Sequence, residues 1–349
     1  MEQYFYHMAP EHGPRVVAIG GGTGLSTLLR GLKIYTKQIT AIVTVADDGG
    51  GSGVLRQDLG MPPPGDIRHC MEALANAEPL MVQLLQYRFS EGGLAGQSFG
   101  NLLLAALNGI QPSFDRAVES MSQVLAITGR ILPVTTANVQ LEAEFENGVT
   151  VVGESHIGPC KKEQGCRIRR VRLLPEGTAA LPAAIEAIRD AEMIIFAPGS
   201  LYTSIIPNLL VDGIVDAIRE SDALKVYACN IMTQEGETEG YTVSDHIRAL
   251  FHHGCPGLFQ LCLTNAGTIP PAVLQRYQQV GSDAIFCDKE ACEALGVEVV
   301  SSPVATVENN HVRHNPGHLA RELMSLYAQR TIRVAGATSR HASRSRREK

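Results

Sequence analysis

The sequence lacks several features that would define its class at once. It has no tryptophan, and aromatic residues make up only 5% of its 349 residues. No apolar run approaches the roughly 18 residues that cross a bilayer. The start, Met1-Glu2-Gln3-Tyr4, lacks the basic and apolar regions of a signal peptide. The eight cysteines form no C-x-x-C pair and no zinc-finger spacing with histidine. We therefore expect a cytoplasmic protein with reduced thiols, no transmembrane segment and no metal site.

Familiar catalytic motifs are missing as well. The glycine-rich stretch near the N-terminus is not followed by Lys-Ser or Lys-Thr, as a P-loop would require. The chain contains no G-x-S-x-G elbow and no recognisable Ser/His/Asp arrangement. These absences argue against nucleotide hydrolysis of the usual kind and against acyl transfer by a serine nucleophile.

Charge is unevenly distributed along the chain. The net charge is −6, but residues 331–349 carry six Lys/Arg against one acid, Glu348. The rest of the chain has 24 basic and 35 acidic side chains, and an acidic body argues against nucleic-acid binding. We expect residues 1–330 to form a single α/β nucleotide-binding domain. The Ser/Arg-rich segment 331–349 is expected to be a disordered basic tail.

A glycine-rich turn organises the N-terminal region. Val16 to Ile19 predict a short buried strand, four glycines follow at 20, 21, 22 and 24, and a helical pattern opens at Leu25. A strand, a glycine turn and a helix N-terminus together form an anion cradle from backbone N–H groups. The pattern therefore predicts a phosphate-bearing ligand. The alternative is a tight turn that needs glycine only for its geometry.

Alternating strand and helix patterns predict a doubly wound, mostly parallel α/β sheet of the Rossmann-like type. Further strands are expected at 39–46, 193–197, 224–229, 258–263, 283–286 and 297–300, and helices at 66–76, 79–88, 98–109, 114–126, 179–190 and 317–329. Residues 47–66 predict a long Gly/Pro loop. Segment 134–175 alternates and contains the turn Asn147-Gly148, which indicates an antiparallel β insertion. Its loop at 160–162 is expected to be a mobile flap.

Polar residues follow the expected strands at the edge where open parallel sheets bind ligands. Asp47 and Asp48 follow the strand over 39–46, and a carboxylate there could accept from hydroxyls, hold Mg²⁺ or act as a base. Asp66 is a good N-cap, and Arg68 in the first helical turn could reach a phosphate. Each pattern also has a purely structural alternative. Asp47 and Asp48 could form an aspartate turn ahead of the glycines, and Asp66 could cap a helix whose Arg68 lies on the surface. His69 is left out of the site.

A second glycine turn follows the strand over 193–197. Gly199, Ser200, Thr203 and Ser204 form a hydroxyl-rich helix start that predicts a second oxyanion cradle without a fixed charge. Two cradles on one sheet suggest a diphosphate, whereas a merely capped helix is the alternative. Asn101, at the start of another helix, is a candidate for base or ribose recognition.

Taken together, these loops resemble a known superfamily. The stretches that carry the resemblance are G-G-G-T-G-L, T-V-A-D-D-G-G-G-S-G-x-L-R, P-P-G-D-I-R, F-G-N-L and A-P-G-S-L-Y-T-S-I-I-P-N-L. They are similar to the family of 2-phospho-L-lactate transferase and the gluconeogenesis factors, from about Val16 to about Tyr327. Residues 153–157, G-E-S-H-I, and the P-P-G-D-I-R form favour the gluconeogenesis-factor branch.

The resemblance implies a nucleotide site and assigns its residues. The residues that match the first nucleotide loop are Gly21, Gly22, Thr23 and Gly24, and those that match the second phosphate loop are Gly199, Ser200, Thr203 and Ser204. Asp47 and Asp66 match the acidic, catalytic positions near the acceptor. The factor branch resembles proteins that bind a uridine nucleotide-sugar and are needed for normal cell shape during growth on gluconeogenic carbon sources.

Three functional hypotheses follow. The first is a regulatory protein that binds a nucleotide-sugar, whose distal group is held by Asp47, Asp66 and Arg68. It would form a homodimer, act on a protein partner and need no obligatory cofactor. The second is a transferase of the phospholactate type, in which Asp47 or Asp66 takes a proton from the acceptor hydroxyl and Mg²⁺ assists. The third, an NAD-dependent oxidoreductase, rests only on the glycine loop.

Overall fold

Seven parallel strands form the central sheet of the computed structural model, which describes residues 9–345 and their side chains up to residue 332. The strand order is β10-β9-β8-β7-β1-β2-β3, and every neighbouring pair is parallel. The strands are β1 (Val16–Gly20), β2 (Ile39–Val43), β3 (Arg130–Pro133), β7 (Met193–Phe196), β8 (Leu224–Ala228), β9 (Leu261–Asn265) and β10 (Glu298–Ser302). The sheet confirms the expected α/β fold class.

The chain winds outward from the middle of this sheet in two directions. From β1 it proceeds to β2 and β3 on one side, and from β7 it proceeds to β8, β9 and β10 on the other. The strands β1 and β7 are therefore neighbours at the point where the winding reverses. In open α/β sheets, ligands bind in the crevice at the carboxyl ends of the strands flanking such a switch point.

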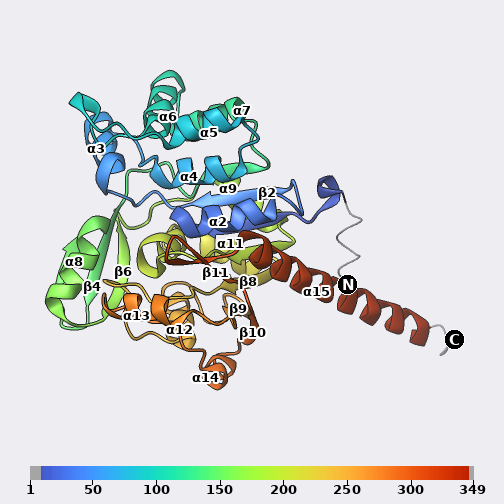
Figure 1. Cartoon of the computed structure of the whole chain (residues 1–349). Coiled ribbons are helices and arrows are strands. Elements are labelled where there is room, and N and C mark those ends of the chain that lie inside the picture. The colour runs from blue at the N-terminus through green and yellow to red at the C-terminus, as the bar shows by residue number, and fades with distance from the viewer. Residues whose placement is uncertain (1–8, 346–349) are drawn as a thin grey trace.

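Helices cover both faces of the sheet, which explains why β1, β2, β7 and β8 are buried along their whole length. The helices are α2 (Gly22–Leu32), α3 (Gly50–Leu59), α4 (Gly65–Leu74), α5 (Pro79–Gln86), α6 (Phe99–Ile110), α7 (Phe114–Val124), α8 (Glu154–Gln164), α9 (Pro182–Asp190), α10 (Ile206–Leu209), α11 (Ile214–Glu220), α12 (Val243–His253), α13 (Pro271–Gln278), α14 (Lys289–Ala294) and α15 (Pro316–Ser345), with short turns η1 (Pro10–His12), η2 (Gly92–Leu94) and η3 (Leu201–Ile205). Figure 1 shows α5, α6 and α7 gathered at one end of the molecule and α12, α13 and α14 at the other.

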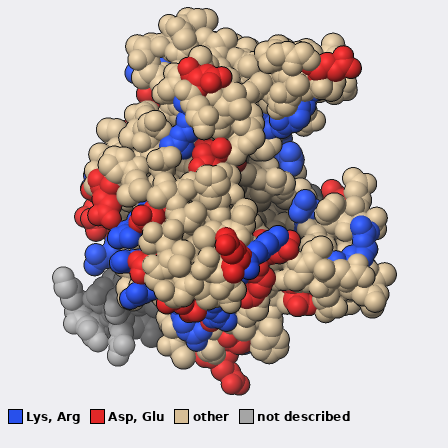
Figure 2. Space-filling view, turned by 90° about the vertical axis from the view of Figure 1, so that its left-hand side faces the viewer, with Lys and Arg blue, Asp and Glu red and all other residues tan. Residues whose placement is uncertain are grey.

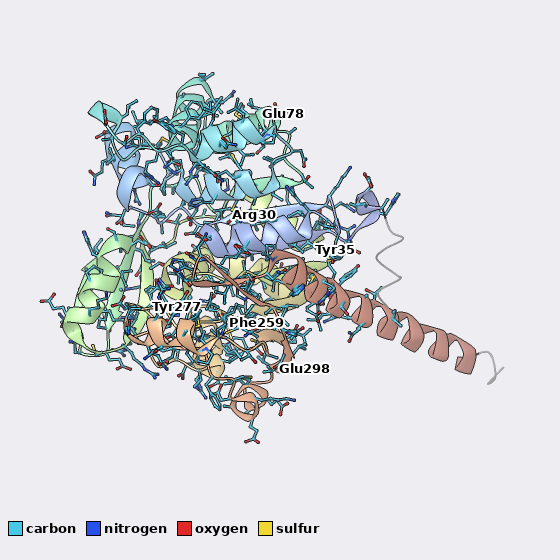
Figure 3. All side chains as sticks on the ribbon, viewed as in Figure 1. Arg30, Tyr35, Glu78, Phe259, Tyr277 and Glu298 are labelled. Carbon is cyan, nitrogen blue, oxygen red and sulfur yellow. The ribbon has the colours of Figure 1, made fainter. Side chains whose placement is uncertain are left out.

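An aromatic cluster fills the core on the side of β7 and β8. The ring of Phe259, labelled in Figure 3, lies 5.4 Å from the ring of Phe196 and 5.6 Å from that of Tyr227, measured between centroids. All three side chains are fully buried. Tilted packing of this kind suits the ring quadrupoles and fixes β7 and β8 against the layer that covers them.

The antiparallel insertion is present, but part of it differs from expectation. Strand β4 (Gln140–Phe145) pairs with β5 (Thr150–Val152) through the predicted Asn147-Gly148 turn and with β6 (Ile168–Leu174). The expected flap around 160–162 is instead the middle of helix α8, which begins at Glu154 and ends at a left-handed Gly165. The local sequence, with Gly158 and Pro159, hides this helix because both residues are poor helix formers.

Three further segments depart from the expectations. The predicted loop over 47–66 contains α3, and residues 283–286 do not join the central sheet. Instead, Ala284 makes an isolated antiparallel bridge to Met232. A small hairpin that no pattern predicted, β11 (Ala305–Glu308) with β12 (His311–His314), follows β10.

Helix α15 is longer than the helix predicted over 317–329. Its backbone is helical to Ser345, through most of the segment for which we expect disorder. Side chains after residue 332 and residues 346–349 lie outside the described residues, so the disorder of the basic tail stays a prediction. Within residues 9–345, none of the helices combines the length and the apolar character needed to span a membrane.

Candidate functional site

The first glycine loop connects β1 to α2 at the switch point. Gly21 precedes the helix in an extended conformation, and no side chain caps the helix N-terminus. The hydroxyls of Ser26 and Thr27 donate to the carbonyl of Thr23, at 3.0 and 2.8 Å, which tightens the first turn. Thr23 itself is exposed. The backbone of this turn therefore presents a helix N-terminus, which favours an anion.

The second loop, which follows β7, lies directly against the first. A Cβ atom added to Gly24 would overlap the carbonyl oxygen of Pro198 and would lie 2.5 Å from its carbonyl carbon. Only glycine allows this approach of the two backbones. The two predicted loops thus meet across the gap between β1 and β7.

Both loops line one cavity of about 600 Å³, which we call the switch-point cavity. From the predicted site it is lined by Gly21, Gly22, Thr23, Gly24, Asp66, Gly199, Ser200 and Ser204. Residues 230–235, after β8, form another part of its wall, and the β11–β12 hairpin closes it on a third side. Its volume falls within the range of about 300–1,000 Å³ that is usual for small-molecule sites.

The donors of the second loop are already used within the protein. Asn230 Oδ1 accepts from the N–H of Gly199 at 2.9 Å, and Gln234 Oε1 accepts from the hydroxyl of Ser200 at 2.8 Å. The carboxyl of Glu237 accepts from the N–H of Tyr202 at 3.0 Å and from the hydroxyl of Thr203 at 2.8 Å.

An internal carboxyl therefore occupies the start of the turn η3, where we expected a phosphate. Thr203 is buried against Glu237 and is not part of the cavity wall. Burial raises the pKa of Glu237 to about 7, although the N–H of Tyr202 and the hydroxyl of Thr203 oppose this rise. The first loop therefore leaves its helix N-terminus uncapped by any side chain, whereas the N–H and hydroxyl donors of the second loop are bonded to other side chains.

Carboxyl groups that follow the ends of β2 and β5 gather around Asp66, on one side of the cavity. Asp66 lines the cavity and accepts from the N–H of Gly22. Burial, followed by the charge of Asp47, raises its pKa to about 7. Asp47 accepts from the N–H of Gly49 at 2.9 Å and is not part of the cavity wall, and burial raises its pKa.

Glu154, at the start of α8, adds a third carboxyl to this group. Burial raises its pKa to about 8, and the charges of Asp47, Glu237, Asp48 and Asp66 act in the same direction. Sequence reasoning missed Glu154 because its segment was expected to belong to an antiparallel β insertion and not to begin a helix. Within the described part of the chain, no group of three or more His, Cys, Asp and Glu side chains is arranged to hold a metal ion.

The raised pKa of Asp66 makes stability depend on pH. An unfolded aspartic acid ionises near pH 4, whereas Asp66 in the folded protein keeps its proton to about pH 7. The free energy of unfolding therefore falls as the pH rises between these values. We expect Asp66→Asn to melt a few degrees above the parent protein at pH 8 and at the same temperature as the parent at pH 4. Each kcal/mol of added stability raises the melting temperature by about 2–4 °C.

Thermal melting of the ligand-free protein at both pH values tests this expectation. The exposed Asp58→Asn serves as the matched control, and its difference from the parent should be the same at pH 4 and pH 8. If the melting temperature of Asp66→Asn differs from that of the parent by the same amount at pH 4 and pH 8, the raised pKa of Asp66 is contradicted.

Arg68 and Asn101 are placed together, but not on the cavity wall. Arg68 Nε donates to Asn101 Oδ1 at 2.9 Å, and its guanidinium pairs with Glu72 in a buried i,i+4 ion pair. Another guanidinium nitrogen lies 2.7 Å from Nε2 of His69. These contacts tie α4 to α6 and leave neither Arg68 nor Asn101 facing the cavity.

Several cavity residues were missed because they belong to no motif. Arg313 is the only lysine or arginine among the described residues that line the cavity. It comes from β12, as does His314, whose Nε2 lies 3.2 Å from the carbonyl of Cys229. Burial lowers the pKa of His314 to about 4, so its ring is neutral at pH 7. Tyr277, labelled in Figure 3, lies on α13 and is the only Phe or Tyr among the described residues that line the cavity.

The chain is similar to known proteins over most of its length. The family model described as 2-phospho-L-lactate transferase CofD matches residues 16–305. A relative from Thermoanaerobacterium thermosulfurigenes is 54% identical over 315 residues, which cover 90% of this chain and 97% of the relative. The gluconeogenesis factor of Bacillus subtilis is 48% identical over 315 residues, covering 90% of this chain and 98% of that protein. A crystal structure of a protein from Bacillus halodurans gives a TM-score of 0.86 at 45% identity, covering 89% of this chain and 99% of that one.

Proposed function

Because the chain belongs to the family of 2-phospho-L-lactate transferase CofD, we propose that it is a gluconeogenesis factor. In this proposal it binds a nucleotide-sugar of the UDP-sugar class and regulates a protein partner. In this role it acts in the cytoplasm and supports normal cell shape during growth on gluconeogenic carbon sources. The name shared by its relatives supports the first part of the proposal, and the switch-point cavity supports the second.

One observation carries the ligand assignment: two loops from distant parts of the sequence meet at the switch point and line one cavity. The N-terminus of α2 and the cation of Arg313 suit the two phosphates of a nucleotide-sugar. The amides of Asn230 and Gln234 line the cavity and suit sugar hydroxyls, because each amide, although bonded within the protein, has a second N–H and a second oxygen lone pair. The ring of Tyr277 offers a face for the base.

Titration calorimetry tests the proposal with the whole chain and a panel of ligands. We expect a UDP-sugar to bind more tightly than UDP, because UDP lacks the sugar that would contact Asn230 and Gln234. GDP and NAD should bind more weakly than either. An absence of heat with every uridine nucleotide, together with clear binding of GDP or NAD, would overturn this assignment.

A transferase activity is the second candidate, and Asp66 is the observation that favours it. A carboxyl whose pKa lies near 7 and which faces the cavity can accept a proton from an acceptor hydroxyl at neutral pH. Because no described group of carboxylates is arranged as a metal site, we derive no step through Mg²⁺. Incubation with a deazaflavin acceptor, a phospholactyl nucleotide donor and Mg²⁺ should then release a nucleoside monophosphate. No release at high protein concentration would exclude this activity.

A further inference from the structure

His314 lines the switch-point cavity, and only one of its two ring nitrogens is bonded to the described part of the protein. Its Nε2 lies 3.2 Å from the carbonyl oxygen of Cys229, the residue that follows β8. Because a carbonyl oxygen can only accept, Nε2 must carry a proton and donate it. This bond holds the ring in place and leaves Nδ1 without a partner among the described residues.

The ring of His314 is neutral, so its Nδ1 is a bare acceptor. Burial lowers the pKa of His314 to about 4, although the bond to the carbonyl of Cys229 opposes this shift. A neutral imidazole has one ring proton, and in His314 that proton is on Nε2. The lone pair of Nδ1 is therefore free, and a ligand group that contacts it must be a donor, either a hydroxyl or an N–H.

His69, the other histidine that lines the cavity, differs in this respect. Its Nε2 lies 2.7 Å from a guanidinium nitrogen of Arg68, and its Nδ1 is enclosed by protein atoms without a partner. The Nδ1 of His314 has no partner either, but it is not enclosed in this way. Of the two described histidines in the cavity wall, His314 is therefore the one that offers a ring nitrogen to a ligand.

The charged residues of the wall indicate how much of the ligand is anionic. Arg313 is the only described lysine or arginine in the wall, whereas Asp66 and Glu235 bring carboxyl groups. Figure 2 shows a similar mixture on the face that it presents, where Lys and Arg lie beside Asp and Glu. Phosphate oxygens in a diphosphate bring only acceptors at neutral pH, so they suit Arg313 but cannot bond to Nδ1 of His314.

We propose that His314 determines specificity in the switch-point cavity, where its Nδ1 accepts a hydrogen bond from a hydroxyl of the neutral sugar that follows the diphosphate. This inference rests on the proposed nucleotide-sugar function and adds the residue that selects a hydroxyl over a further phosphate. Arg313, which suits phosphate, precedes His314 in the chain, and Asn230, whose amide suits the sugar, follows Cys229. His314 therefore adjoins the residues suited to both parts of the ligand.

Two substitutions separate a contact with the ligand from the bond to Cys229. The amide of glutamine lies as many bonds from Cβ as Nε2 of histidine does, and the amide of asparagine as many as Nδ1 does. His314→Gln therefore keeps a donor for the carbonyl of Cys229 and removes the acceptor at Nδ1. His314→Asn keeps an acceptor at the position of Nδ1 and loses the bond to Cys229.

Titration calorimetry of the full chain with UDP-glucose and with UDP tests the proposal. The readout is the ratio of the two dissociation constants, because both ligands contain the same uridine diphosphate. We expect His314→Gln to lower the preference for UDP-glucose about 5-fold, the effect of one neutral hydrogen bond, and to leave the affinity for UDP unchanged. His314→Asn should keep the preference of the parent. A residue that acted only through Cys229 would give the opposite order.

His311→Gln is the matched control, because His311 lies on the same strand, is exposed and does not line the cavity. It should leave the ratio unchanged, and circular dichroism establishes that each variant is folded.

The inference alone is overturned if His314→Gln keeps the preference of the parent, or if His314→Asn loses as much of it as His314→Gln does. A parent protein that binds UDP as tightly as UDP-glucose also contradicts it. A parent that binds neither ligand overturns the nucleotide-sugar proposal and this inference together.

Discussion

Replacing Gly24 with alanine is expected to weaken binding of a UDP-sugar by about 100-fold, equal to about 2.7 kcal/mol. The new methyl group would overlap the carbonyl oxygen of Pro198 and would lie 3.0 Å from the backbone nitrogen of Gly199. Both contacts are with backbone, which cannot rotate away as a side chain can. The two loops must therefore separate, and the cavity that they share must widen at the point where the diphosphate would lie.

Stability should fall together with affinity in this variant. Overpacking of a tight contact costs about 1–3 kcal/mol. At about 2–4 °C per kcal/mol, the melting temperature should therefore fall by about 2–12 °C. Gly109→Ala is the matched control, because Gly109 also lies in a helix and an added Cβ there meets nothing within 4 Å. A Gly24→Ala protein that binds the ligand as the parent does would show that the contact between the loops is unimportant.

Reversing the charge of Arg313 is the second change with a large expected effect. Arg313→Glu removes the only lysine or arginine among the described residues of the cavity wall and places a carboxylate near the phosphates. A hydrogen bond to a charged group contributes about 1.5–3 kcal/mol, and repulsion adds to its loss. We expect affinity for a UDP-sugar to fall by about 100-fold or more, measured by calorimetry.

The dependence on salt distinguishes an electrostatic role of Arg313 from a structural one. Because Arg313 is exposed, its attraction to phosphate should weaken as ionic strength rises. The parent protein should therefore lose affinity between low and high salt more steeply than Arg313→Ala does. Arg321→Glu, on the exposed part of α15, is the control and should bind as the parent does. If Arg313→Glu and Arg321→Glu lose the same affinity for the UDP-sugar, a specific contact between Arg313 and the ligand is contradicted.

The sequence predicted the parts of the fold whose signals are local. Buried apolar runs predicted six of the seven central strands but missed β3, and the spacing of leucines predicted α2. Helix α3 was missed because three glycines within residues 50–53 resemble a loop. In the structure, a Cβ at Gly53 would overlap the carbonyl oxygen of Asp48, so this glycine permits the helix to form against the preceding loop. Helix propensity alone cannot reveal such a tertiary reason.

In the candidate site, too, the residues that have a local sequence signal were predicted and the others were missed. Glycine turns after strands identified both loops, because the geometry of a parallel sheet places them at one edge. Arg313 and Tyr277 carry no such signal, since Tyr277 lies on α13, which follows β9, and Arg313 lies on the β11–β12 hairpin, which follows β10. Thr203 shows the opposite error, because a hydroxyl at a helix start satisfies an internal carboxyl as readily as a ligand. Pattern alone does not distinguish the two.

The adjacency of β1 and β7 has a consequence for the synthesis of the chain on the ribosome. Strand β1 is made early, whereas its neighbour is completed only when residue 196 has been added. Until then, a nascent chain carries the first loop with one edge of an apolar strand unpaired, and no pocket exists. Unpaired strand edges promote aggregation. We therefore expect a chain that stops before Met193 to lack the switch-point cavity and to be prone to aggregation.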